Sequence, residues 1–336
     1  MNHPPLLCNC LVISGKFHKI GQCDAFARLR LRRYLPRGRF PRLVWPRLRP
    51  RARIPIRVGA TPRHEQNSTR EAVVGSFFCA VRLTPWPIVL PAAAGIAAGV
   101  VAWGAVQHSS QLFGPALCRT QQGSQIALTF DDGPNPAITP GLLALLEKRD
   151  VRATFFLVGR FARACPALAR EIAARGHTIG NHTETHPNLV LSSPRRVEDQ
   201  IVRCQTSIAG ALDGTASEPP KWLRPPFGYR LPHVWTAARR AGLGGVVMWS
   251  LTAYDWKPQP PARLIARLAR VAQRRASAAG GLGGEIVLLH DGDFRRLGAD
   301  QGHVLVALEH WLPRWQDAGF EFVTIDQVAG ATAKTA

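Results

Sequence analysis

The chain has 336 residues, of which 46% are hydrophobic and 19% charged, and a formal net charge of +21. This composition suits a globular protein with a membrane segment, and the length allows one large domain or two small ones. The charge alone would suggest nucleic-acid binding, but residues 1–85 hold 17 Lys/Arg against 3 Asp/Glu while the remaining residues hold 26 against 19, so we expect no nucleic-acid partner for the folded body.

Residues 1–85 form a basic extension. The stretch 26–57 is rich in Arg and Pro and has no sustained helical or strand period, so we expect it to be disordered. One interpretation is a tail that contacts acidic lipid or nucleic acid. The other is a start codon assigned too early. Met1 and Met248 are the only methionines, so a later start before the apolar segment requires a non-ATG codon, for example at Val81.

Residues 86–106, WPIVLPAAAGIAAGVVAWGAV, carry no charge in 21 positions, about the length of helix that crosses a bilayer. Signal-peptide cores are shorter, and no clear small-residue cleavage site follows, so we expect an uncleaved anchor. Arg on its N-terminal side places the N-terminus in the cytoplasm and the body outside, on the periplasmic or extracellular face. A cleaved signal and a buried soluble helix remain alternatives, the latter because Pro87 and Pro91 interrupt the run. Residues 107–123 then read as a linker.

From residue 124 to 330, apolar β-rich runs alternate with amphipathic stretches. The runs are 125–130, 153–159, 177–182, 222–227, 245–251, 285–291 and 320–326. Such alternation predicts an α/β fold with a parallel sheet and outer helices, and about seven units favour closure into a barrel. In this part of the chain, Cys165 and Cys204 could form a disulfide, but the sequence does not establish this bond.

The chemically active residues follow the ends of the expected strands, where α/β barrels gather their chemistry. These residues are Asp131 and Asp132, His182 and His186, Arg224, Asp255 and Trp256, and His290 and Asp291.

Two adjacent carboxylates, Asp131 and Asp132, precede Gly133 and Pro134. They fit a turn with a helix cap. Neighbouring side chains on an extended backbone point to opposite sides, however, so one carboxylate can bind a metal while the other faces the reacting atoms. With His182 and His186, one Asp makes a His₂-carboxylate set that leaves an open position, as catalytic zinc requires; a structural role for the two His is the alternative.

A purely structural role is the alternative for both Arg224 and His290. Arg224 would then be a solvated cation in a surface loop, and His290 an imidazole buried in the core. The two prolines that follow Arg224 fix the backbone, so that a nearby amide N–H can be aimed at a developing charge. His290, at the end of an apolar strand, is a candidate proton donor.

Five short segments closely resemble, in the same order, the five motifs of the polysaccharide deacetylase family, the chitin deacetylase and NodB-like enzymes. They are TFDDGP, HTETH, RPPFG, DW and LLHDG. The resemblance covers about 124–330. It implies a distorted (β/α) barrel and a divalent metal, usually zinc, that serves to remove acetyl groups from the N-acetylated sugars of a polysaccharide or oligosaccharide.

The resemblance also implies roles. Asp131 corresponds to the general base, Arg224 to the residue that orients it, and His290 to the general acid. Asp132, His182 and His186 correspond to the metal ligands. The Phe227 amide corresponds to the oxyanion donor, with Asp255 and Trp256 expected beside the substrate.

The fourth motif departs from the family pattern, because Thr252 stands where a first Asp is common. If that carboxylate tunes the acid, the pKa of His290 is lower here, or Asp255 or Asp291 replaces it. The same site acting on O-acetyl sugars is an alternative function, and a carbohydrate-binding protein with a degraded site is an alternative of another class.

Overall fold

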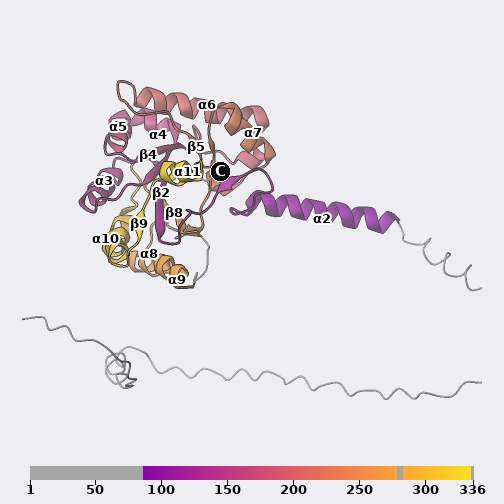
Figure 1. The fold of residues 1–336 in the computed structure, drawn as a ribbon. Helices are drawn as coiled ribbons and strands as arrows, with labels where there is room; N and C mark the ends of the chain where they lie inside the picture. Colours follow the sequence, from indigo (N-terminus) through magenta and orange to yellow (C-terminus); the bar gives the residue numbers. More distant parts are fainter. Residues whose placement is uncertain (1–85, 278–282, 334–336) are drawn as a thin grey trace, which may run out of the picture. The chain divides into compact units, whose positions relative to one another are not determined.

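A parallel β-sheet that curls toward a barrel lies at the centre of the computed structural model, which describes residues 86–277 and 283–333 (Figure 1). In this part of the chain the strand order is β7–β8–β2–β3–β4–β5–β6–β1, and β9 pairs with β2. An isolated bridge between Arg119 and Glu285 links the β1 side of the sheet to β8. The strands are β1 (Ala116–Leu117), β2 (Gln125–Gly133), β3 (Thr154–Leu157), β4 (Thr178–Asn181), β5 (Trp222–Leu223), β6 (Gly245–Val247), β7 (Leu251–Thr252), β8 (Glu285–His290) and β9 (Glu321–Phe322).

The predicted α/β barrel is confirmed, with two more described strands than expected. The additional strands, β1 and β7, have two residues each and leave no hydrophobic period in the sequence. Since β1 pairs with β6, part of the segment expected as a linker, 107–123, belongs to the sheet.

Helices surround the strands in Figure 1. Several of them, including α5, α6, α7 and α8, begin with Pro at the first positions, where its missing N–H costs no hydrogen bond. The described helices are α2 (Trp86–Val106), α3 (Thr139–Lys148), α4 (Gly159–Ala164), α5 (Pro166–Ala174), α6 (Pro194–Ala211), α7 (Pro232–Arg240), α8 (Pro261–Leu268), α9 (Arg270–Ser277), α10 (Gly302–Asp317) and α11 (Ile325–Ala333), with short 3-10 turns η2 (Leu189–Leu191) and η3 (Pro226–Gly228).

The alternation of side chains along β2 sorts its residues between two cores. Ile126, Leu128 and Phe130 join the cluster that the helices α3, α5, α6, α8 and α10 cover. Ala127 belongs to a separate cluster to which α11 contributes Ile325 and Val328. Because successive strand residues face opposite sides, Asp131 has the same orientation as Ala127 and lies on the inner face.

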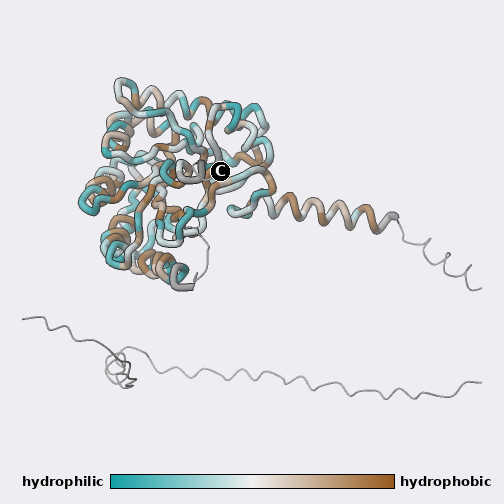
Figure 2. The backbone as a smooth tube through the Cα atoms, in the orientation of Figure 1, coloured by the Kyte–Doolittle hydropathy of each residue, from teal (hydrophilic) through white to brown (hydrophobic). Residues whose placement is uncertain are grey.

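Helix α2 coincides with the predicted apolar run 86–106. Its window Val89–Val106 is long and apolar enough to cross a membrane, and only 11% of that window is buried. Figure 2 shows the helix in brown and pale tones. The expectations for residues 1–85, including the basic tail and a later start, lie outside the described residues.

Cys118, Cys165 and Cys204 are free thiols. Cys204 is buried in the core between sheet and helices. The alternative of a Cys165–Cys204 disulfide is therefore not realised.

Candidate active site

The predicted chemical residues converge at the carboxyl ends of the strands. Asp131 and Asp132 end β2, His290 ends β8, His182 follows β4 and Arg224 follows β5. Each of these residues, and His186 as well, is at most 9% exposed to solvent. Buried polar side chains require hydrogen-bond or ionic partners.

The two adjacent carboxylates face one site. The β2–β3 register shifts between Asp131 and Gly133, and Asp132 has a φ of 71°. This left-handed residue turns its carboxylate back, so that Oδ1 lies 3.5 Å from His182 Nε2 and 3.4 Å from His186 Nε2. The expectation that the two side chains point to opposite sides of the strand is thus wrong for this pair.

Asp132, His182 and His186 form a compact donor set, with one ligand atom of each within 4.8 Å of the others. The pKa of His182 is lowered to about 3 and that of His186 to about 2, chiefly by burial, so both imidazoles are neutral, as metal ligands must be. Burial raises the pKa of Asp132 to about 7, and its Oδ1 is a buried atom without a hydrogen-bond partner. A cation at this point would supply the missing partner.

The backbone carbonyl of Arg224 fixes the tautomer of His182. Its oxygen lies 2.7 Å from His182 Nδ1, so that nitrogen carries the proton and donates it. The lone pair of Nε2 then faces Asp132, an arrangement typical of metal-ligating histidines. Two imidazole nitrogens and one carboxylate oxygen fit zinc, with a position left open.

Asp131 is held by a buried guanidinium. Arg224 is fully buried, and its Nη1 donates to Asp131 Oδ1 at 2.8 Å and to Thr129 Oγ1 at 2.7 Å. Its Nη2 donates to the Met248 carbonyl at 3.0 Å, and the guanidinium lies 4.1 Å from the Phe156 ring centroid. The other oxygen of Asp131, Oδ2, remains on the side of His182, 3.7 Å from its Nε2.

His290 is paired with Asp255. The carboxylate accepts from the His290 backbone N–H at 2.7 Å and contacts its Nδ1 at 3.0 Å. Burial alone lowers the pKa of His290, but the Asp255 charge and hydrogen bond, with Asp132 and Asp131 behind them, raise it to about 9. The ring therefore carries a proton at neutral pH.

Asp255 does not lie where we expected it, beside the substrate. The residue is fully buried, and both oxygens contact His290, so it lies behind the His290 ring. Of the two carboxylates that could replace the one missing at Thr252, Asp255 is the one that contacts His290. Asp291 does not: it accepts a hydrogen bond from Thr139, and burial raises its pKa to about 7.

Two partly exposed aromatic residues lie beside the site. Phe227 has a φ of 60° in η3, and its ring lies 4.7 Å from the His186 ring. Trp256 lies 6.2 Å from the His290 ring and 5.3 Å from that of Tyr254. Phe227 and Trp256 are each 45% exposed, which leaves them free to contact a bound molecule.

Phe294 is a site residue that the motifs do not reveal. Its ring stacks on that of His186 with 4.0 Å between the ring centroids. The one signal in the sequence is a large apolar side chain in the polar stretch 291–296, directly after the fifth motif.

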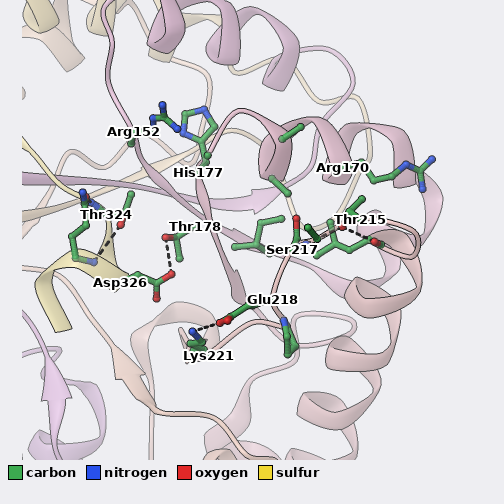
Figure 3. Close-up of a pocket in the computed structure, with 18 residues that line it drawn as sticks. Arg152, Arg170, His177, Thr178, Thr215, Ser217, Glu218, Lys221, Thr324 and Asp326 are labelled. Atoms are coloured by element: carbon green, nitrogen blue, oxygen red, sulfur yellow. Dashed lines mark hydrogen bonds and ion pairs between the residues drawn. The ribbon is translucent and has the colours of Figure 1, made fainter. Parts of the chain in front are cut away.

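A separate cavity of about 950 Å³ lies where the strands begin, away from these residues (Figure 3). Arg152, His177 and Thr178 line one part of it, and the ion pair of Lys221 with Glu218 lies in another part. It includes no predicted site residue. Because its chemistry is that of ordinary surface polar groups, we place the functional site at the opposite strand ends.

Comparison with known proteins identifies relatives of this chain. The family model described as polysaccharide deacetylase matches residues 119–246. A chitooligosaccharide deacetylase of Sinorhizobium fredii is 35% identical over 208 residues, which cover 60% of this chain and 90% of that protein. A peptidoglycan-N-acetylglucosamine deacetylase of Listeria monocytogenes is 33% identical over 216 residues, 64% of this chain and 41% of that longer protein.

Solved structures show the same fold. The crystal structure of a peptidoglycan N-acetylglucosamine deacetylase has a TM-score of 0.54 at 29% identity, covering 63% of this chain and 91% of that one. A CE4 family pseudoenzyme from Bacillus anthracis has a TM-score of 0.53 at 26% identity, covering 64% and 68%. The fold therefore occurs with and without activity, and the side chains decide between the two.

Proposed function

The chain belongs to the polysaccharide deacetylase family, and on that basis we propose that it is a metal-dependent hydrolase that removes acetyl groups from N-acetylated sugars of a polysaccharide or glycoconjugate outside the cytoplasm. One observation carries the proposal. An Arg-held carboxylate, Asp131, and a carboxylate-held imidazole, His290, both adjoin the set Asp132–His182–His186. A degraded, binding-only site would not retain this whole set.

Asp132, His182 and His186 would hold the divalent cation, for which zinc suits the donor atoms. When bound, such an ion polarises the acetyl carbonyl and lowers the pKa of water.

Asp131 acts as the general base. It takes a proton from the attacking water as the water oxygen adds to the acetyl carbon. Arg224 keeps the carboxylate in one orientation through the 2.8 Å bond, so that Oδ2 is the atom left to accept the proton. The Phe227 backbone N–H would donate to the oxygen that becomes negative, and Pro225 and Pro226 restrict the backbone around it.

His290 acts as the general acid. Asp255 holds Nδ1, which leaves Nε2 to give its proton to the sugar nitrogen as the C–N bond breaks. The products are acetate and the free amine. Trp256, beside His290, would contact the leaving sugar through its exposed ring.

Residues 124–330, together with β1, constitute the proposed catalytic domain. Helix α2 is the proposed anchor, because it is apolar along its length and exposes Leu90, Ile96 and Trp103. The Arg-rich sequence before it would retain the N-terminus in the cytoplasm and place the domain outside.

The test uses the full chain, purified in a non-ionic detergent and loaded with zinc. Acetate release is measured from chitooligosaccharides, peptidoglycan and an O-acetylated xylan. The proposal predicts release from N-acetylated substrates that a chelator abolishes and zinc restores. Release from the O-acetyl substrate alone would make the protein an esterase, and no release from any of them would favour a binding protein.

A further inference from the structure

A short turn after β8 places aromatic and basic side chains beside the proposed metal ligands. The Phe294 ring stacks on the His186 ring with 18° between their planes, and it meets the Phe227 ring edge-on at 5.5 Å. Arg295 follows directly, with its guanidinium carbon 5.0 Å from the Phe294 ring centroid. A cation therefore lies only one aromatic ring away from His186.

The turn is held by its own hydrogen bonds. Asp293 accepts from the backbone N–H of Arg295 through Oδ1 and from that of Arg296 through its carbonyl, both at 2.9 Å. Arg160 of α4 donates to the Phe294 carbonyl oxygen. These contacts fix the backbone, so the position of Arg295 beside Phe294 is built into the fold.

Three arginines in or beside the turn 293–296 lack carboxylate partners. Within residues 86–277 and 283–333, Arg160, Arg295 and Arg296 form no ion pair, whereas Arg163 and Arg224 are paired with Glu184 and Asp131. The Nε of Arg160 is buried and has no hydrogen-bond partner. Arg295 and Arg296 are exposed. Three unneutralised guanidinium groups at the edge of a site favour an anionic ligand, which guanidinium binds through paired hydrogen bonds.

We infer that the substrate is an acidic glycan, which carries a carboxylate or phosphate on or next to the N-acetylated sugar, and that Arg295 and Arg296 bind this anion. That the substrate is a glycan rests on the proposed function. That the glycan is acidic rests on the arginines of the turn 293–296. A neutral N-acetylated oligosaccharide would fill the same site without contacting these guanidinium groups. The arginines thus set substrate preference and take no part in the chemistry.

The experiment compares a hyaluronan hexasaccharide, which alternates N-acetylglucosamine with glucuronate, and neutral chitohexaose. Binding to the zinc-loaded full chain in detergent is measured by calorimetry in an Asp131→Asn background that prevents turnover. We expect the acidic hexasaccharide to bind roughly tenfold more tightly, the size of one charge-assisted hydrogen bond. The double variant Arg295→Gln/Arg296→Gln should lose this preference. Arg314→Gln, an exposed charge near the C-terminal end of α10, should retain it.

Two results would overturn the inference: equal affinity for both hexasaccharides, or a preference that survives in the double variant. If the double variant lost binding to phosphatidylglycerol vesicles but retained the wild-type sugar preference, the arginines would face lipid. Phosphorylated oligosaccharide, added as a second acidic ligand, separates phosphate from carboxylate recognition. Acetate release from chitohexaose by the wild-type chain tests the proposed function separately, so the two can fail independently.

Discussion

Arg224 and Asp131 form a buried ion pair, with Nη1 2.8 Å from Oδ1, and this pair distinguishes two carboxylates that are neighbours in sequence. Asp132 has no such partner and faces two imidazoles instead. We base the proposed division of roles between base and ligand on these contacts, because backbone direction alone does not separate the two side chains.

Removal of Arg224 tests the ion pair. Arg224→Ala should lower the free energy of unfolding by about 3–5 kcal/mol, since it leaves Asp131 buried without its partner. Acetate release should fall with it. Arg224→Lys, which retains the charge, should recover part of the stability, and Arg314→Ala should have little effect on it. Urea unfolding followed by circular dichroism measures the difference; an unchanged midpoint for Arg224→Ala would contradict the pairing.

Asp255 should control the pH dependence of the reaction. The pKa of His290 is raised to about 9, above the 6.5 of a free imidazole, so the general acid is protonated below pH 9 and lost above it. The stability that this pair contributes is likewise complete below pH 6.5 and lost as the pH rises through 9. Asp255→Asn should move the alkaline limb of kcat/KM to lower pH.

The control for that profile is Asp317→Asn, an exposed acid at the end of α10. Its profile should match the wild type. An alkaline limb that stays in place in Asp255→Asn would show that Asp255 does not tune His290.

The metal set makes a separate prediction. His186→Ala removes one of three ligands, so zinc content should fall from one equivalent to near zero and activity should disappear with it. His310→Ala, a histidine of α10 outside the site, serves as the control. Atomic absorption after dialysis provides the measurement, and full zinc with full activity in His186→Ala would make the two histidines structural.

The position of α2 after Arg-rich sequence predicts how the chain is oriented across the membrane. A reporter active only outside the cytoplasm, fused after Ala336, should be active, because Arg-rich sequence precedes the apolar helix. The same reporter fused before Trp86 should be silent. The opposite pattern would place the catalytic domain in the cytoplasm and remove the proposed localisation.

Sequence periodicity predicts the parts of the site that regular strands position. Asp131 and His290 end apolar strands whose alternation gives each side chain its inner face. The left-handed φ of Asp132 is not marked in the sequence, because an Asp adopts this conformation only occasionally. The place of Asp255 behind His290 likewise depends on two strand ends meeting in space.

The shortest strands and the aromatic residue Phe294 could not be predicted from the sequence, for other reasons. The strands β1 and β7 have only two residues each, too few to show a period of two. Phe294 lies in a polar turn that matches no motif, and only its stacking on His186 reveals its proximity to the ligands. Residues positioned by loops are those that the sequence alone cannot place.

Zinc content and turnover, measured on the same two variants, distinguish the proposed base, Asp131, from the proposed metal ligand, Asp132. Zinc content and acetate-release rate are determined for Asp131→Asn and Asp132→Asn. We predict that Asp131→Asn retains zinc and loses turnover by roughly 10²–10⁴-fold, while Asp132→Asn loses zinc, because a neutral amide is a poorer ligand than a carboxylate. Equal loss of zinc in both variants would make both carboxylates ligands and contradict the assignment of Asp131 as the base.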